Sequence, residues 1–279
     1  MPFDTGRLLS RPPLITRQVL ARRDTILYAL GVGASELQFV YEENLEALAT
    51  MPAILGNPGF FWRDPELGVD WKRVLHGEQS VEIHAPLPVE GDILGKTVIE
   101  SLIDKGPDKG AIAYIRRDVS DATGKQLATV RSASVLRGNG GFGGSSSSGP
   151  KPHSPPPERA ADSNLSLPTA PNQALIYRLC GDYNPLHIDP AVARAANFST
   201  PILHGLCTYG VAGRALMAAL CGNEPARIKR IDVRFSSPVY PGETIVTEIW
   251  REGAGQATFR ASVAERNLLV LNNGYAEFK

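Results

Sequence analysis

The stretch GLCTYGVAGRALMAAL, residues 205–220, constrains the fold more than any other part of the chain. Small and apolar side chains fill it, and Arg214 is its only charged residue. A helix of this composition is buried on most of its faces. We therefore expect it to lie at the centre of the fold, with a β-sheet wrapped around it.

Helical patterns followed by strand patterns occur twice along the 279-residue chain. In the first part we predict helices over 24–30 and 42–51, then strands over 80–84, 93–103, 111–119 and 126–136. In the second part we predict helices over 173–180 and 205–220, then strands over 228–235, 244–250, 257–264 and 268–278. The segments PLPVEGD (86–92) and PVYPGE (238–243) echo each other. The pattern favours a duplicated unit.

A change of composition separates the two parts. Between residues 138 and 171, 20 of 34 residues are Gly, Pro or Ser, which is typical of a linker. The prediction is an N-terminal half over 1–137, a linker over 138–171 that includes Ser145–Ser148, and a C-terminal half over 172–279. The glycine-rich start of the linker lacks the Gly-Lys-Ser/Thr of a nucleotide loop.

Composition narrows the class of protein. With 43% hydrophobic residues and 29 basic side chains against 29 acidic ones, the chain has no basic surplus that would suggest a nucleic-acid partner. Three irregularly spaced cysteines form neither a disulfide framework nor a zinc site. We expect no membrane span or signal peptide and a cytoplasmic location. The ending YAEFK does not form a peroxisomal signal of the Ser-Lys-Leu type, although a peroxisomal location stays open as an alternative.

The reactive side chains are densest in YRLCGDYNPLHIDP, residues 177–190. Asp182, Asn184 and His187 lie within six residues, and the turn at Pro185 can bring the carboxyl and imidazole groups together. Such a pair can serve as a general acid and base. The alternative is structural, with Asp182 and Asn184 capping backbone groups and His187 half-buried. The acidic residues are not clustered in the way that the ligands of a metal site are.

Several motifs together resemble one enzyme family. GDYNPLH (181–187) and PILHGLC (201–207), with LHGEQ (75–79), PLP (86–88), DKG (104–106) and GGFGG (140–144), are similar to the hydratase 2 group of the MaoC-like (3R)-specific enoyl-CoA hydratases. This group includes the hydratase domain of peroxisomal multifunctional enzyme type 2. The resemblance implies an α+β double hot-dog fold, in which two antiparallel sheets each wrap around a central helix. It also implies a homodimer.

The activity implied by this resemblance is reversible hydration of trans-2-enoyl-CoA to (3R)-3-hydroxyacyl-CoA, without a metal or a cofactor apart from the CoA of the substrate. Asp182 and His187 would be the catalytic pair, Asn184 would orient them, and the Gly205 N–H would bind the thioester oxygen. A helix N-terminus suits that last role because unpaired N–H groups and the positive end of the dipole meet there. The division of acid and base roles between Asp182 and His187 stays open.

The resemblance also implies a set of acyl-CoA contacts, which are His76, Gly77, Lys105, Tyr183, Pro185, Leu186 and Phe235. Lys105 could meet a CoA phosphate or be an ordinary turn lysine, and Phe235 could line a channel or be an inward strand residue. For His204 we expect only local backbone hydrogen bonds. No Asp-x-Asn-x-x-His set precedes the linker. The prediction is therefore one active site per chain, in the second half, with the first half binding and covering substrate.

Two other functions fit the same fold. One is an acyl-CoA thioesterase, and the other is an acyl-CoA-binding module without catalysis. The intact set of acid, amide and imidazole disfavours both.

Overall fold

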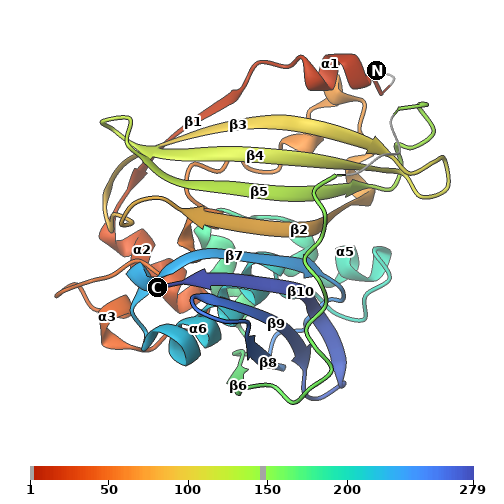
Figure 1. Ribbon diagram of the computed structural model, residues 1–279. Helices are drawn as coiled ribbons and strands as arrows, with labels where there is room; N and C mark the ends of the chain where they lie inside the picture. Colours follow the sequence, from red (N-terminus) through yellow and green to blue (C-terminus); the bar gives the residue numbers. More distant parts are fainter. Residues whose placement is uncertain (1–2, 145–148) are drawn as a thin grey trace.

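The computed structural model describes residues 3–144 and 149–279, which form one ten-stranded antiparallel sheet with the helices on one side of it (Figure 1). The strand order is β1-β3-β4-β5-β2-β7-β10-β9-β8-β6. The first-half strands are β1 (Leu14–Leu20), β2 (Val74–Ile83), β3 (Gly91–Asp104), β4 (Ala111–Asp121) and β5 (Gln126–Leu136). The others are β6 (Ser163–Pro168), β7 (Ile228–Phe235), β8 (Thr244–Arg251), β9 (Gln256–Val263) and β10 (Leu268–Phe278).

The strand order supports the duplication, because reading outward from the centre gives the same order in each half. β2, β5, β4, β3 and β1 correspond to β7, β10, β9, β8 and β6. The prediction of two separate sheets is wrong, since β2 pairs with β7 over Glu78–Glu82 and joins the halves into one sheet. Opposite charges face each other across this seam, with Glu78 opposite Arg234 and Glu82 opposite Arg230.

The helix α6 (Gly205–Cys221) confirms the prediction of a buried apolar helix, and the second half of the sheet packs on it. The other helices are short: α1 (Thr5–Leu9), α2 (Arg22–Gly31), α3 (Leu37–Val40), α4 (Gln173–Tyr177) and α5 (Pro190–Ala195). Single 3-10 turns complete the list: η1 (Met51–Ala53), η2 (Phe61–Arg63), η3 (Pro65–Leu67), η4 (Trp71–Arg73), η5 (Arg178–Cys180), η6 (Pro185–His187) and η7 (Pro225–Arg227). No helix among the described residues has the length and apolarity to cross a membrane.

The first half of the sheet has no counterpart of α6 among the described residues. The helix predicted over 42–51 is wrong, because Asn44 adopts a positive φ of 55° and the chain continues as an irregular segment into η1. Residues 47–55 bury Leu48, Met51 and Leu55 against the sheet instead. The other predicted helix of this half, over 24–30, is confirmed as α2, which packs mainly against α3, α4 and η5.

The predicted linker contains more structure than its composition indicates. Residues 163–168 form the edge strand β6, which pairs with β8. Before it, the chain crosses the face of the sheet opposite the helices (Figure 1). There His153 Nε2 lies 2.7 Å from a carboxylate oxygen of Asp232, and the His153 carbonyl accepts a hydrogen bond from Asn273. The run Ser145–Ser148 lies outside the described residues.

The glycine-rich start of this segment is anchored by one carboxylate. Asp104, at the end of β3, accepts hydrogen bonds from the N–H groups of Gly106, Gly141 and Gly143, each at 2.8 Å. These bonds lower the pKa of Asp104. The backbone around Gly140 approaches Gly106 and Gly110 so closely that a Cβ would collide with their carbonyl oxygens. Backbone packing therefore requires glycine at position 140.

We predict that Gly213→Ala destabilises the fold even though Ala favours helices. Its Cβ would collide with Cγ2 of the buried, stiff Thr50 side chain, and overpacking of this kind costs about 1–3 kcal/mol. Urea denaturation measures the loss. Thr50→Ser removes that methyl group but keeps the hydroxyl that Tyr28 contacts at 3.0 Å, so the double variant should recover much of the stability. Equal destabilisation of single and double variants would contradict this packing argument.

We predict that Asp104→Asn lowers the melting temperature at neutral pH, because an amide oxygen binds backbone N–H groups more weakly than a carboxylate does. The folded pKa of Asp104 is depressed, so its contribution is present above the unfolded value and is lost as the pH falls through the folded value. The gap in melting temperature between wild type and variant should therefore close on acidification. The exposed Asp108 of the same hairpin, changed to Asn, is the control.

Candidate active site

The loop from Gly181 to His187 holds its polar side chains in place through its own backbone. Gly181 ends η5 with a φ of 112°. Asp182 Oδ1 then accepts a hydrogen bond from the Asn184 N–H, and Asn184 Oδ1 accepts one from the Leu186 N–H, both at 3.2 Å. The predicted capping by Asp182 and Asn184 is therefore confirmed, whereas His187 is buried instead of half-buried. Because the same bonds fix the loop, capping and catalysis are compatible here.

His187 is buried, and its tautomer follows from its partner. Its Nδ1 lies 2.9 Å from the carbonyl oxygen of Ile202, which can only accept a hydrogen bond. The proton of the neutral ring is therefore on Nδ1, and Nε2 carries a free lone pair. Burial lowers the pKa of His187 below 6.5, although Asp182 and the Ile202 carbonyl oppose that shift. The result is an uncharged imidazole at neutral pH that presents a basic nitrogen.

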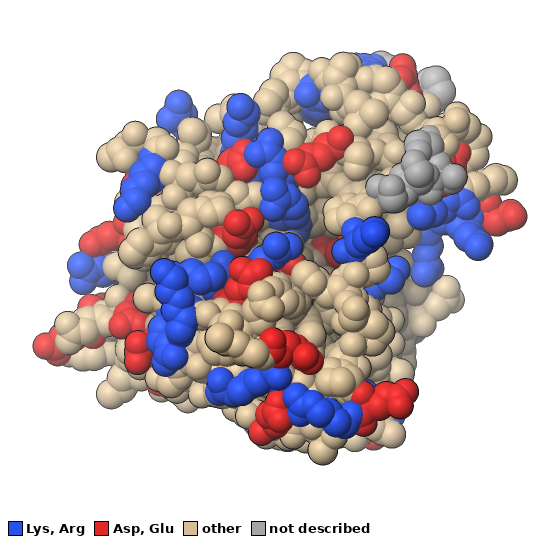
Figure 2. All heavy atoms as spheres, viewed as in Figure 1, with Lys and Arg blue, Asp and Glu red and all other residues tan. Residues whose placement is uncertain are grey.

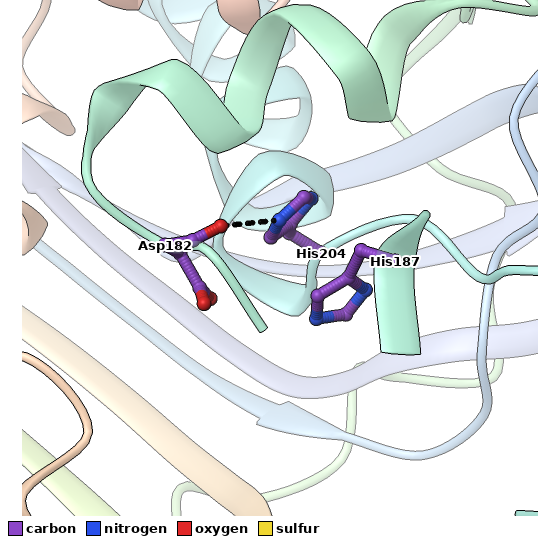
Figure 3. A group of neighbouring side chains, drawn as sticks. All are labelled: Asp182, His187 and His204. Carbon is purple, nitrogen blue, oxygen red and sulfur yellow. Dashed lines mark hydrogen bonds between the residues drawn. The ribbon is translucent and has the colours of Figure 1, made fainter. Parts of the chain in front are cut away.

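His204 belongs to the same cluster, although the sequence predicted only local backbone hydrogen bonds for it. Its ring stacks on His187 with 3.8 Å between centroids and 26° between planes. Its Nε2 donates to the backbone carbonyl of Asp182 at 3.2 Å, as the dashed line in Figure 3 shows. Burial, followed by the neighbouring His187, lowers the pKa of His204 to about 4. The signal was available, since His204 directly precedes the glycine that starts α6.

Contacts extend the cluster from the start of α6 into the first half of the molecule. A Cβ at Gly205 would lie 3.3 Å from the ring of Phe235. That ring in turn lies 4.8 Å from the ring of His76, at the start of β2. At Gly77 the pairing of β2 with β5 shifts register, a bulge of the kind that often re-aims side chains beside active sites. Phe235 thus lies between Gly205 and His76 and contacts both.

The remaining predicted residues lie outside the cluster of Asp182, His187 and His204. Tyr183 is exposed, with the guanidinium group of Arg178 4.9 Å from its ring centroid. Pro185 and Leu186 are half-buried in η6. Lys105 is exposed in the turn after β3, and within residues 3–144 and 149–279 no contact joins it to His187.

The site also has residue types that bind metals. One ligand atom from each of Asp182, His187 and His204 lies within 4.8 Å of the others. The two imidazole rings, however, stack instead of converging on a point, and each uses one nitrogen on a backbone carbonyl. This arrangement is better suited to moving a proton than to holding an ion.

Comparison with known proteins defines the class first. A double-hotdog protein of Mycobacterium tuberculosis, 16% identical, covers 99% of the chain and 98% of its own length with a TM-score of 0.57, which shows the fold alone. Two family models match, the MFE-2 hydratase 2 N-terminal domain over residues 19–138 and the MaoC like domain over 153–273. The class is therefore the double hot-dog, MaoC-like proteins.

Relatives narrow the class to a family. The chain is 44% identical to 3-hydroxyacyl-thioester dehydratase Y of M. tuberculosis, with 92% of each covered. It is 41% identical to probable enoyl-CoA hydratase 2 of Dictyostelium discoideum, with 99% of this chain and 97% of the other covered. A MaoC-like dehydratase structure from Phytophthora capsici has 40% identity, 98% coverage of both chains and a TM-score of 0.88. The chain belongs to the MaoC-like hydratase 2 family.

We predict that His204 is a positioning residue for Asp182 and His187. His204→Phe keeps a ring on His187 but loses the hydrogen bond to Asp182, whereas His204→Gln keeps a donor but loses the stack. Each should lower kcat by about tenfold, with a smaller change in KM, because Asp182 and His187 would shift relative to bound substrate. Steady-state kinetics and circular dichroism together test this. Wild-type kcat in both folded variants would contradict the role.

Proposed function

We propose that the protein hydrates trans-2-enoyl-CoA reversibly to (3R)-3-hydroxyacyl-CoA. The family supports a hydratase or dehydratase activity, since these two names describe the two directions of one lyase reaction. The main support for hydration of trans-2-enoyl-CoA is the neutral, buried His187. Its free Nε2 lies in one cluster with Asp182, beside the first turn of α6. The relatives' names differ in the carrier, which is CoA in one and an unspecified thioester in the other.

The proposed reaction adds water across the double bond next to the thioester. His187 Nε2 takes a proton from water as the oxygen bonds to C3, and C2 receives a proton. We assign delivery of that proton to Asp182 in its protonated form, either directly or through the same water, and the proton taken up by His187 then returns to Asp182 to complete the cycle. The side-chain nitrogen of Asn184 has no hydrogen bond among the described residues and is available to hold the water.

Negative charge develops on the thioester oxygen during this addition, and α6 offers a donor for it. The Gly205 N–H is the first of the helix, and the described residues provide it with no hydrogen-bond acceptor. A donor aimed at developing charge in a partly buried site is worth about 100- to 1000-fold in rate in other enzymes. The ring of Phe235 against Gly205 would limit where the thioester can lie.

The first half is proposed to bind and cover substrate without performing chemistry. His76 reaches the site through Phe235, and Asp182 and Asn184 have no equivalent pair before the linker. Because residues 47–55 replace a central helix there, the two halves differ on the inner face of the sheet. This difference is compatible with one site per chain.

The test is to mix the protein with crotonyl-CoA, follow loss of the enoyl absorbance, and resolve the product enantiomers. We expect (3R)-3-hydroxybutyryl-CoA and no free thiol. Release of thiol would support the thioesterase alternative. Binding without a change in absorbance would support a non-catalytic module.

We predict that Asp182→Asn and His187→Gln fold normally but lower kcat at least about 100-fold, as is typical for general acid and base groups. Gly205→Val should be similarly inactive, because its side chain would crowd Phe235 and the thioester. For the wild type, the low pKa of His187 places the acid limb of kcat/KM below pH 6.5. Near wild-type turnover in either Asp182→Asn or His187→Gln would refute the assignment.

A further inference from the structure

A series of four aromatic rings leads from the first half of the molecule to His187. The ring of Tyr28, on α2, lies 6.2 Å from that of Tyr177, on α4, measured between centroids. The Tyr177 ring lies 4.9 Å from His204, and His204 lies 3.8 Å from His187. Figure 3 shows His204 and His187 at the end of this series. We call these four residues the ring column.

The ring column is buried and is anchored at the end far from His187. Tyr28 is 0% exposed, and Tyr177 and His204 are each 1% exposed. The Tyr28 hydroxyl lies 3.0 Å from Oγ1 of Thr50, in the segment that covers the first-half sheet. Because a protein interior is close-packed, a buried ring that moves displaces the ring beside it. The position of His187 therefore depends on residues distant from it in the sequence.

Tyr177 occupies the middle of the ring column, and the end of α2 packs directly on it. A Cβ at Gly31 would lie 3.4 Å from both Cα and Cδ2 of Tyr177. The Tyr177 hydroxyl oxygen is buried and has no hydrogen-bond partner among the residues that the structure describes. Burial of an unpaired hydroxyl lowers stability. The fold therefore uses the ring of Tyr177 and not its hydroxyl group.

The ring column lies on the helix side of the sheet, away from the face in Figure 2, where basic and acidic side chains are interspersed. In the described structure its ionisable neighbours include Asp182, Arg178, Cys180 and Cys207. Burial raises the pKa of Cys180 to about 12 and that of Cys207 well above its usual range, so both thiols are neutral. Burial is also the main cause of the lowered pKa of His187.

We propose that Tyr177 is a positioning residue for the proposed reaction, because its ring holds the stack of His204 on His187 in place. This inference rests on the proposed function. It assigns the role to the flat ring, so another aromatic side chain at position 177 should serve as well as tyrosine. It also makes the chemistry at His187 depend on α2 and α4, which contain none of the proposed catalytic groups.

The first experiment separates the ring of Tyr177 from its hydroxyl. Tyr177→Leu keeps an apolar side chain but removes the ring, and it should lower kcat on crotonyl-CoA about tenfold with a smaller change in KM. Tyr177→Met, whose flexible side chain fills irregular gaps, is a second variant for the same test. Tyr177→Phe should keep the wild-type kcat and raise the melting temperature, since it removes an unpaired buried hydroxyl.

The matched control is Phe259→Leu, which removes an equally buried ring from β9. No ring contact within residues 3–144 and 149–279 joins Phe259 to the ring column. This variant should lose stability through the same kind of cavity but keep the wild-type kcat.

The second experiment follows the pKa of His187, which a loss of stability alone does not change. A looser ring stack admits water and reduces the burial that lowers this pKa. In Tyr177→Leu, the pKa should therefore rise towards 6.5, and the acid limb of kcat/KM should move to higher pH. In Tyr177→Phe and Phe259→Leu, the acid limb should stay where it is in the wild type. An NMR titration of the His187 ring measures the same change without substrate.

The outcomes separate the two proposals. A raised pKa of His187 in Tyr177→Leu, without hydration of any thioester by the wild type, would refute the proposed function but support the ring column. An equal loss of kcat in Tyr177→Phe and Tyr177→Leu would overturn this inference, because the hydroxyl would then be the required group. So would a wild-type kcat with an unmoved acid limb in folded Tyr177→Leu or Tyr177→Met, or an equal loss of kcat in Phe259→Leu.

Discussion

The close approach of first-half segments to α6 is the constraint on which the rest of the structure depends. Gly210 and Gly213 leave no room for a Cβ, because Val32 and Thr50 occupy the space where one would project. Two residues from separate parts of the first half thus pack directly on the helix backbone. The larger of the two hydrophobic clusters among the described residues results, and in it residues of both halves bury each other. The packing of both halves on α6 consequently fixes the position of its first turn, which begins with Gly205 directly after His204.

The candidate site uses few side chains because the backbone performs most of the positioning. Asp182 and Asn184 each bond an N–H two residues further on, and His187 and His204 each bond a carbonyl. Each polar group of the cluster is therefore oriented by a peptide group whose position is set by the local turn. Backbone partners also decide the tautomers, which leaves one nitrogen of each ring free. Preorganisation of this type lowers the cost of aligning the groups during reaction.

Much of the fold could be predicted from local pattern, and the errors have physical causes. The helix α6 and the strands β3, β4, β7 and β9 carry periodic or β-branched signals that match their burial. Edge strands such as β6 have one neighbour, and their short alternating patterns resemble loops. The pairing of β2 with β7 is non-local, although its complementary charges were visible once aligned. For the site, the motif located Asp182 and His187, whereas the stack of His204 on His187 depends on tertiary folding.

The two halves share a topology, but different interactions cover the inner face of the sheet in each half. The second half packs an apolar helix against its strands. The first half instead buries Arg117 of β4, whose Nη2 donates to the carbonyls of Pro52 and Ala53 at 3.2 and 2.6 Å. Burial lowers the pKa of Arg117 to about 10, so it stays charged at neutral pH without a carboxylate partner in the described structure. The Arg117 cation on two peptide oxygens and the 3-10 hydrogen bonds of η1 together hold this segment. The first half can therefore omit a central helix and still cover its sheet.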